Sequence, residues 1–600
     1  MKSKIKMLLN LFDKKEKKKL IIILMMMVIA ASLETIGIGM IVPFVGIITN
    51  PEVIKEQTLL NNIYSFFNFP STSVFIIFSV IILLAIFIVK NSYLLLFNYI
   101  QYRVILNQQV KLQSKLFKEY LTKPYTFHLD RNTSTLLRNV NGEVSRVFQG
   151  IVLSLFQLLT EILIIVFILV LLLFSAPLAT LTASVLLGIS IFLFFKVFRK
   201  KISQLGKEQQ KVSGTVIKWV NQGLGASKEV KVSGREAFFI NSYTKQSLIK
   251  VKNSRYMKML EVVPRLFIET LLVSIVLITM LVIVLQGANT TNLVSTIALF
   301  AMAAFRIMPS INRVVALITT IKYSQPALNV VYEDLFLNKD PLLGTKIGTN
   351  DSNKSPLKTF REAIKLTGVS FKYPNQKDYS VKDISLTIPI GKSVAFIGES
   401  GAGKTTLVDI ILGLLHPEKG RVLVDDIDLQ DQISLWQKKI GYIPQTIFLS
   451  DDTIRGNVAF GINAKEIDDE QVWNALEQAQ LKDFVLSLPG KLDTTVGERG
   501  VRLSGGQRQR IGIARALYHN PEILFMDEAT SALDNETERE IMKAIDGLRG
   551  QKTLIIIAHR LSTIKNCDIV FKMKKSELVE IENENRKLNS RLKVRGARLN

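Results

Sequence analysis

The chain has 600 residues, 48% of them hydrophobic, and a formal net charge of +25. One hydrophobic core does not organise a chain of this length, so we expect several domains. Because the basic residues alternate in blocks with long apolar runs, the composition indicates a membrane protein, and no nucleic-acid partner is expected. The single cysteine, Cys567, excludes an intrachain disulfide.

Six apolar runs in the first half of the chain have the length of a membrane-spanning helix, which needs about 20 residues to cross about 30 Å of hydrocarbon. The predicted spans are 20–48, 73–97, 152–174, 178–195, 262–285 and 293–318. The N-terminus and the segments after the second and fourth spans are rich in Lys and Arg, whereas the alternate loops are not. The positive-inside rule therefore places both ends of the chain in the cytosol.

The long connections on the cytosolic side have helical character, so we expect the spans to continue beyond the membrane. The second half of the chain alternates apolar strand-like runs (SVAFIG, EILFMDE, TLIIIAH) with helical segments, which predicts an α/β domain. The expected divisions are a transmembrane domain at 1–337, a linker at 338–358, a globular domain at 359–576 and a basic tail at 577–600. The tail carries no motif, and we expect it to be solvated or to face the membrane.

A phosphate-binding loop is predicted at the sequence GESGAGKTT, because it fits the G-x-x-x-x-G-K-[ST] template between an apolar strand and an apolar helix. In such a loop, backbone N–H groups and the helix N-terminus surround the phosphates. Lys404 is expected to reach the β- and γ-phosphates, and the Thr405 hydroxyl to bind Mg²⁺. The complete set of loop residues is Gly398, Glu399, Ser400, Gly401, Ala402, Gly403, Lys404, Thr405 and Thr406.

Two carboxylates, Asp527 and Glu528, end the apolar strand ILFMDE. Beside a phosphate-binding loop, the first is placed to hold Mg²⁺ and the second to polarise an attacking water. Adjacent acids alone carry little information, so this interpretation depends on the loop that precedes them.

The motif LSGGQ, followed by RQRIGIARAL, resembles the signature of the ATP-binding-cassette (ABC) superfamily. Other elements follow in the family's order: YP, GYIPQ, the exporter X-loop VGERG, the D-loop SALD and the switch AHR. The resemblance implies ATP and Mg²⁺ as cofactors. It further implies that Tyr373 stacks on adenine, that Gln445 contacts Mg²⁺ and the reacting water, and that His559 joins Glu528 and Gln445 in catalysis. The remaining implied ATP contacts are Ser504, Gly505, Gly506, Gln507 and Asp534.

In this family a signature motif completes the ATP site of a second cassette. One cassette per chain therefore implies a homodimer with two composite sites, or a heterodimer with a related chain. Glu528, His559 and LSGGQ are all present, so this subunit does not need a partner with better residues. Soluble ABC ATPases that act on DNA or ribosomes are disfavoured by the six spans, and an ATP-gated channel or receptor is disfavoured by Glu528.

Six spans before one cassette resemble an exporter half-transporter. The implied fold is a six-helix transmembrane domain fused to an α/β P-loop ATPase in the cytoplasmic (inner) membrane of a bacterium, with the cassette and both termini in the cytosol. The resemblance also implies short coupling helices in the intracellular loops. We expect them near 131–140 and 224–234.

Four cations lie in or near the spans: Lys90, Arg265, Arg306 and Arg313. A charged side chain at the centre of a bilayer costs about 2.5–3.5 kcal/mol on insertion scales, so such residues usually have a role. They can line a cavity for a diphosphate or another anionic headgroup, since an arginine fork suits phosphate oxygens. Alternatively, Lys90, Arg265 and Arg313 lie at the cytosolic interface, or the cations form structural ion pairs with acids in the spans, namely Glu34, Glu161 and Glu269.

Three segments, KMLEVVPRLFIETLL, FRIMPSINRVV and TLLNNIYSFFNFP, resemble bacterial flippases for polyprenyl-diphosphate-linked oligosaccharides, which serve protein N-glycosylation. The resemblance implies a lipid-linked anionic substrate, contact with membrane lipid and a short outward-facing helix between the first two spans. An apolar stripe on that helix suits a polyprenyl tail or a plain interfacial anchor. Exporters of a lipid A-like lipid, a glycolipid, a peptide or a drug remain alternatives. The stripe residues are Leu59, Leu60, Ile63, Phe66 and Phe67.

Overall fold

The computed structural model divides the chain into two compact units. One contains Met1–Lys123 and Asp130–Gly344, and the other contains Pro124–Leu129 and Thr345–Asn600. The described residues are 2–40, 44, 47–48, 51–52, 54, 57–175, 177–285, 290–337, 361–374, 376–528, 535–558, 564 and 566–583. The expected linker at 338–358 lies outside them.

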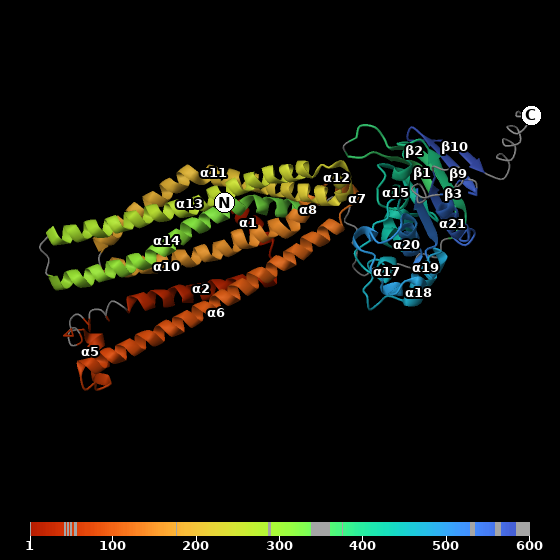
Figure 1. Ribbon diagram of the computed structural model, residues 1–600. Helices are drawn as coiled ribbons and strands as arrows, with labels where there is room; N and C mark the ends of the chain where they lie inside the picture. The colour runs from red at the N-terminus through yellow and green to blue at the C-terminus, as the bar shows by residue number, and fades with distance from the viewer. Residues whose placement is uncertain are drawn as a thin grey trace, which may run out of the picture. The chain divides into compact units, whose positions relative to one another are not determined.

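The first unit is helical (Figure 1), and six of its described helices are long. Four expected spans lie within one of these helices, and the span at 152–174 starts two residues before α10. The first expected span, 20–48, overlaps α2 as far as Gly39, and its remainder is only partly described. This arrangement agrees with the predicted six-helix domain. The long helices are α2 (Lys14–Gly39), α6 (Thr72–Leu121), α10 (Ser154–Ser175), α11 (Pro177–Gly225), α13 (Glu236–Leu285) and α14 (Thr290–Tyr332). The shorter elements are α1 (Lys2–Asn10), α5 (Thr58–Phe66), α8 (Thr133–Arg138), α9 (Val144–Val147), α12 (Ser227–Ser233) and the π-helical turns η1 (Asn139–Glu143), η2 (Phe148–Leu153) and η3 (Glu333–Leu337).

The lengths of these helices follow from what surrounds them. Hydrocarbon offers no hydrogen-bond partner, so a spanning segment must satisfy its backbone groups internally. Helices α6 and α13 have 50 residues each. At about 1.5 Å per residue each is about 75 Å long, so more than half of it must extend beyond the bilayer. By length and composition, three helical stretches of the described chain qualify as membrane spans: Lys14–Gly37, Thr72–Leu121 and Thr133–Leu171.

Within this unit the helices form two groups that diverge toward the end that carries α5 (Figure 1). Helices α2 and α6 lie side by side, while α10, α11, α13 and α14 contact one another. The most apolar part of α6 is almost wholly unburied in the isolated chain, and Leu84, Ile88 and Leu95 are exposed. Exposed apolar faces on a spanning helix suit contact with lipid.

The second unit is the predicted α/β domain. A six-stranded sheet in the order β10-β9-β3-β8-β7-β6 is parallel except for β10, and an antiparallel sheet has the order β2-β1-β4-β5. Strand β7 is buried on both faces because helices cover a parallel sheet. The strands are β1 (Ala363–Phe371), β2 (Val381–Pro389), β3 (Ser393–Gly398), β4 (Lys419–Val424), β5 (Ile427–Asp428), β6 (Ile440–Ile443), β7 (Ile523–Asp527), β8 (Thr553–Ile557), β9 (Ile569–Lys574) and β10 (Glu577–Asn583).

The helices of this unit are α7 (Tyr125–Asp130), α15 (Lys404–Ile411), α16 (Ile433–Gln437), α17 (Ile454–Val458), α18 (Asp469–Gln478), α19 (Lys482–Ser487), α20 (Gly505–Leu517) and α21 (Asn535–Asp546), with short 3₁₀ turns at Leu429–Gln432, Lys491–Asp493 and Glu498–Gly500. In this unit α17, α18 and α19 gather beside α20 (Figure 1), and α20 contacts the sheet at β6.

One expected boundary needs correction. The globular domain does not end at residue 576, because β10 pairs with β9 and extends the sheet to Asn583. The range 131–140, where a short helix was expected, holds α8 and the start of η1, and a further short helix, α7, precedes it. The other expected range, 224–234, holds α12, which ends at Gly234, whose φ of 62° closes the turn.

Helix packing in the first unit depends on close backbone approach at Gly206 of α11. A Cβ atom there would lie 2.3 Å from the Tyr323 carbonyl oxygen of α14, whereas one at Gly188 in the same helix would meet nothing within 4 Å. We expect Gly206→Ala to destabilise the protein by about 1–3 kcal/mol through overpacking. Gly188→Ala should be neutral or slightly stabilising, since alanine favours a helix. Thermal unfolding of both variants in detergent measures this, and equal midpoints would contradict the packing assignment.

Candidate nucleotide site and charged residues of the long helices

The predicted phosphate-binding loop joins β3 to α15 in the second unit. Gly401 and Gly403 have φ angles of 80° and 93°, a region that glycine adopts without strain. A Cβ at Gly403 would also lie 2.1 Å from the Ser380 carbonyl oxygen. The Lys404 Nζ donates hydrogen bonds to the carbonyl oxygens of Gly398 (2.9 Å) and Glu399 (3.0 Å), so the ammonium lies inside the curve of the loop. The loop can therefore surround an anion with backbone N–H groups and one buried cation.

The carboxylates at the end of β7 face this loop. Asp527 is buried, and Glu528 follows it with a φ of 47°, in the left-handed region that non-glycine residues adopt uncommonly. The Gln445 Nε2 donates a 2.8 Å hydrogen bond to Glu528 Oε2. Burial lowers the pKa of Lys404, while the charges of Glu528 and Asp527 act in the opposite direction. The structure thus brings together the loop lysine, both carboxylates and the Q-loop glutamine, as the motifs predicted.

A third acid at this site, Asp409 of α15, was missed by the motif analysis. Burial, reinforced by the charge of Asp527, raises the pKa of Asp409 to about 7. Burial and the same two acids also raise the pKa of Tyr442. Tyr125, from the short helix α7, has its pKa raised by burial, then by Asp409 and Tyr373. The position of Asp409 could be read from the sequence, because it lies about one turn into the helix that the loop begins, but its burial depends on packing.

The other predicted ATP contacts lie at two further places in the unit. The Tyr373 hydroxyl lies 3.2 Å from Thr406 Oγ1, and its ring packs edge-on against Phe371. Ser504 caps α20: its Oγ accepts from the Gln507 backbone N–H, and the Gln507 side chain accepts from the Ser504 N–H. This cap leaves Gly505 and Gly506 in the first turn, where backbone N–H groups favour an anion. His559 and Asp534 lie outside the described residues.

Two of the four cations that the sequence analysis singles out, Lys90 and Arg313, contact acids. The Lys90 Nζ lies 3.6 Å from Glu34 Oε1, and both side chains are buried between α6 and α2. The Arg313 guanidinium contacts both oxygens of Glu161, with Nε 2.6 Å from Oε1 and Nη2 3.3 Å from Oε2. These contacts are the structural ion pairs stated above as the alternative. Arg265 is exposed, and Arg306 lies within α14 with its side chain outside the described residues.

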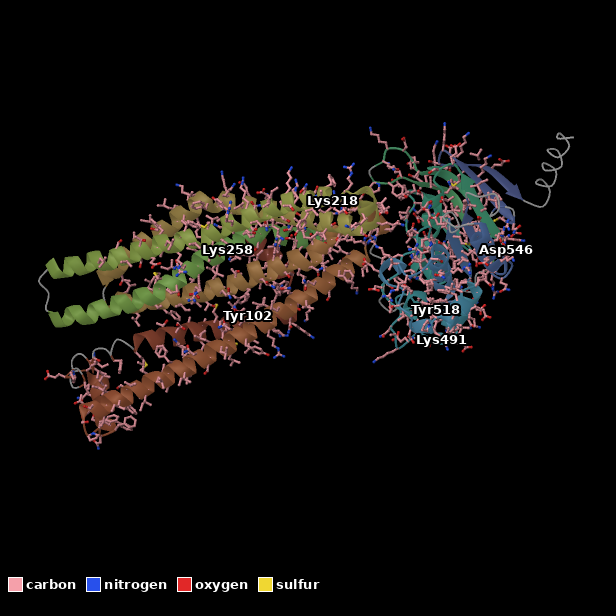
Figure 2. All side chains as sticks on the ribbon, in the orientation of Figure 1. Tyr102, Lys218, Lys258, Lys491, Tyr518 and Asp546 are labelled. Carbon is pink, nitrogen blue, oxygen red and sulfur yellow. The ribbon has the colours of Figure 1, made fainter. Side chains whose placement is uncertain are left out.

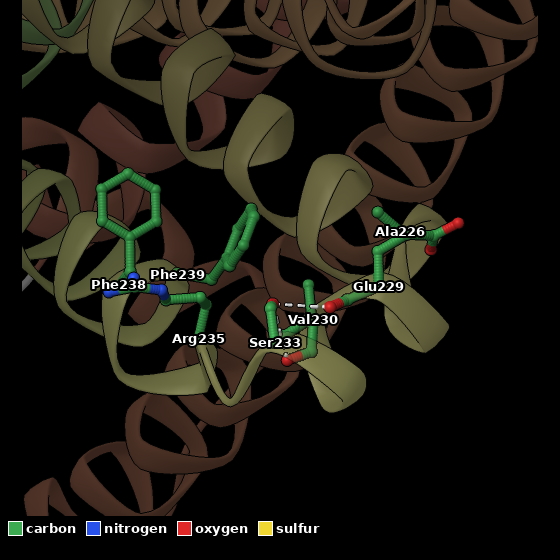
Figure 3. Close-up of a pocket in the computed structure, with 7 residues that line it drawn as sticks. All are labelled: Ala226, Glu229, Val230, Ser233, Arg235, Phe238 and Phe239. Atoms are coloured by element: carbon green, nitrogen blue, oxygen red, sulfur yellow. Dashed lines mark hydrogen bonds between the residues drawn. The ribbon is translucent and has the colours of Figure 1, made fainter.

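The turn between α11 and α13 carries a pocket of about 400 Å³ (Figure 3). It lies beside α12, where the Ser233 hydroxyl donates to the Glu229 carbonyl oxygen and Trp219 packs edge-on against Phe238 and Phe239. Val232, at the end of α12, is 83% exposed. The pocket is lined by Ala226, Glu229, Val230, Ser233, Arg235, Phe238 and Phe239. An apolar surface of this kind on a short helix is typical of a docking site.

The residues of the second unit fit a nucleotide triphosphate with Mg²⁺. The loop presents N–H donors and an ammonium to phosphates, while the Thr405 hydroxyl and the Asp527 carboxylate are hard oxygen donors of the kind that Mg²⁺ prefers. The half-buried Glu528, held by Gln445, lies beside them as a candidate base.

Comparisons with known proteins agree with this geometry. A family model described as "ABC transporter" matches residues 381–531, and one described as "ABC transporter transmembrane region" matches residues 20–308. The chain is 31% identical over 479 residues to an ATP-dependent lipid A-core flippase of Cupriavidus metallidurans, which covers 78% of each chain. It is also 31% identical over 516 residues to one of Desulfotalea psychrophila, covering 83% of this chain and 86% of the relative.

Among solved structures, a bacterial Atm1-family ABC exporter with ATP bound superposes with a TM-score of 0.77 at 22% sequence identity, covering 98% of this chain and 99% of the other. That likeness shows the fold, and the two flippases show the family. The chain therefore belongs to the ABC transporter superfamily, as an exporter-type half-transporter that hydrolyses ATP.

Proposed function

We propose that this exporter flips an oligosaccharide linked to polyprenyl diphosphate across the bacterial inner membrane, with its cassette and both termini in the cytosol. The observation that carries the proposal is α5, the short helix between the first two long helices. Phe66 is 82% exposed and Phe67 is 56% exposed at its end. A single-tailed polyprenyl chain is long and unsaturated, so it suits an exposed aromatic surface.

The aromatic residues around α5 form a connected cluster rather than isolated side chains. Phe67 contacts Phe66, Phe69 and Phe78 with ring centroids 5.2, 5.9 and 5.4 Å apart. Phe69 also contacts Phe75 and Phe78. Of the predicted stripe, Ile63, Phe66 and Phe67 are exposed, Leu60 packs inward, and the Leu59 side chain lies outside the described residues. The inward packing supports the helix while its tip stays available to a lipid.

Among the cations, Arg265 and Arg306 are the proposed contacts for the diphosphate. Arg265 is exposed, Arg306 is proposed from the sequence alone, and Lys90 and Arg313 have acid partners. A guanidinium binds two phosphate oxygens at once, which an ammonium does not. Arg313 keeps half of its side chain exposed despite the Glu161 contact, so it stays a secondary candidate. Lys90 is buried, and we assign it to holding α2 against α6.

A second candidate substrate is a lipid A-like lipid, which the names of the two relatives favour. Both candidates are anionic amphiphiles that carry phosphate and sugar, so the arginines alone do not separate them. They differ in the tail: lipid A carries several acyl chains, whereas polyprenyl diphosphate carries one long chain. The surface of α5 is therefore the feature that discriminates between them.

For ATP hydrolysis we propose that Lys404 and the loop N–H groups bind the phosphates, and that Tyr373 stacks on adenine. Mg²⁺ would be held by Thr405, Asp527 and Gln445, and it would neutralise charge on the transferred phosphoryl group. Glu528 accepts a proton from the attacking water, and Gln445 orients Glu528 through their hydrogen bond. His559 and Asp534 are proposed partners from the sequence alone.

We further propose a homodimer. The Ser504-capped turn of α20 would supply N–H donors to the ATP of a second copy, since its side-chain hydrogen bonds stay within its own motif. The pocket beside α12 offers an apolar surface on which a cassette would dock.

Glu528→Gln should retain ATP binding and lower hydrolysis by a factor of about 10²–10⁴, because the amide cannot act as a base. Nucleotide binding and phosphate release by the purified protein measure the two effects. Glu470→Gln, an exposed acid in the first turn of α18, is the matched control and should hydrolyse normally. Normal turnover in Glu528→Gln would remove this residue from its proposed role.

Arg306→Ala and Arg265→Ala should each abolish flipping of a polyprenyl-diphosphate oligosaccharide in proteoliposomes while basal ATPase activity persists. The physical reason is the loss of a bidentate phosphate contact. Arg103→Ala, an exposed arginine of α6, controls for the general loss of positive charge. Unimpaired flipping by both variants would contradict the proposed headgroup site, and transport of lipid A alone by the wild-type protein would favour the second candidate.

Phe66→Ala combined with Phe67→Ala should slow flipping of a long-chain polyprenyl substrate more than that of a short-chain analogue, because only the long tail loses contact with α5. The measurement is the ratio of the two flipping rates, with Phe117→Ala, an exposed residue of α6, as the control. An equal effect on both substrates would make α5 a plain interfacial anchor.

A further inference from the structure

A buried polar node of three side chains, Tyr120, Asn139 and Asp334, lies in the first unit, outside the apolar runs 73–97, 152–174 and 293–318 that the sequence predicts as spans. The Tyr120 hydroxyl donates to Asp334 Oδ2, and the Asn139 Nδ2 donates to the same carboxylate oxygen (3.0 Å) and to the Tyr120 oxygen (3.2 Å). The three residues are only 4%, 1% and 4% exposed. Each contacts the other two, so the node is a closed triangle of hydrogen bonds.

The three residues come from parts of the chain that are far apart in sequence. Tyr120 ends α6, Asn139 opens the π-helical turn η1, and Asp334 lies in the π-helical turn η3 that follows α14. Turns of this kind are uncommon and often occur at functional positions. Two of the three node residues therefore lie where the helix departs from regular geometry.

The node residues lie close in sequence to the points at which the chain passes from one compact unit to the other. The chain passes between the two compact units at three points: after Lys123, after Leu129 and after Gly344. Tyr120 lies three residues before the first point, Asn139 nine residues beyond Asp130, and Asp334 ten residues before the third point. At each of these three points a segment of the first unit leads to or from the second unit. The node links these three segments to one another by hydrogen bonds.

Arg138 links the node to helix α11. The Arg138 Nη2 donates to Asn139 Oδ1 (2.9 Å), and its Nη1 donates to the Gln210 carbonyl oxygen of α11 (3.1 Å). A Cβ at Gly214 would lie 2.7 Å from that same Nη1, so a glycine provides the room for the guanidinium. Moving one segment without the others would leave buried polar groups without hydrogen-bond partners, which is costly. The three segments therefore keep one arrangement or move together.

We propose that the Tyr120–Asn139–Asp334 node is a coupling device: it makes the three connecting segments move as one body, so that the cassette's ATP cycle changes the separation of the helix groups. The three side chains are positioning residues, not catalytic ones. The proposal holds whichever lipid is transported, because it concerns the transmission of motion.

A substrate-independent experiment tests this. The chain has one cysteine, so Cys567→Ser gives a background in which spin labels can be placed at Ser73 and Leu181, both exposed and near the starts of α6 and α11. These helices belong to the two groups that diverge in Figure 1. Pulsed electron paramagnetic resonance measures the distance between the labels with and without ATP and vanadate, and a fluorescent nucleotide measures ATP binding.

In Tyr120→Phe and Asp334→Asn we expect normal ATP binding but loss of the ATP-dependent distance change. Coupling between sites usually amounts to about 5- to 150-fold, so the shifted population should fall by about tenfold. The double variant should be no worse than either single one, because the residues act as a unit. Matched controls are Tyr102→Phe, exposed on α6 (Figure 2), and Glu333→Gln, exposed beside Asp334; both should respond as the background does.

An unchanged distance response in both node variants would overturn the proposal. A parallel fall in ATP binding and in the thermal midpoint, with the two controls unaffected, would also overturn it, because the node would then only stabilise the fold.

Discussion

The need of a spanning segment to satisfy its own backbone hydrogen bonds is the constraint on which the rest of this structure depends. It makes the spans helical, and a helix that is not interrupted at the membrane surface continues as a stiff rod. Helices α6 and α11 have 50 and 49 residues with no proline in their interiors, whereas α13, with 50 residues, contains Pro264. An uninterrupted helix carries movement from one end to the other, while an internal proline is where a helix kinks.

Stiff rods transmit motion only if they are held at defined points, and the structure provides two kinds. Close backbone contacts hold helix against helix, as between Gly206 of α11 and the carbonyl of Tyr323 in α14. Buried polar contacts specify one register, as between Lys90 and Glu34 or within the Tyr120–Asn139–Asp334 node. Apolar packing alone tolerates sliding, whereas an unsatisfied buried charge or hydrogen bond does not.

In the cassette, the parallel sheet fixes the positions of the site residues. Strands β3 and β7 both pair with β8 and run in the same direction, so their carboxyl ends meet at one edge. That edge places Lys404 beside Asp527 and Glu528, and β6 brings Gln445 to the same place. The motifs predicted these roles because the residue types are adjacent to strand ends. The strained φ of Glu528 and the burial of Asp409 were not predictable, because they depend on packing by distant residues.

The sequence by itself determined the six spans, the α/β cassette, the phosphate-binding loop and the carboxylates, since each depends on local pattern: length of apolar run, glycine spacing, or an acid after a strand. It left open whether the cations in the spans bind substrate or acids, because an ion pair joins residues as distant as Glu161 and Arg313. Tertiary structure gave Lys90 and Arg313 acid partners, added the short helix α7 before the expected range, and extended the sheet to Asn583. It alone disclosed the node, because no periodicity relates Tyr120, Asn139 and Asp334; only the folding of three segments onto one another brings them together.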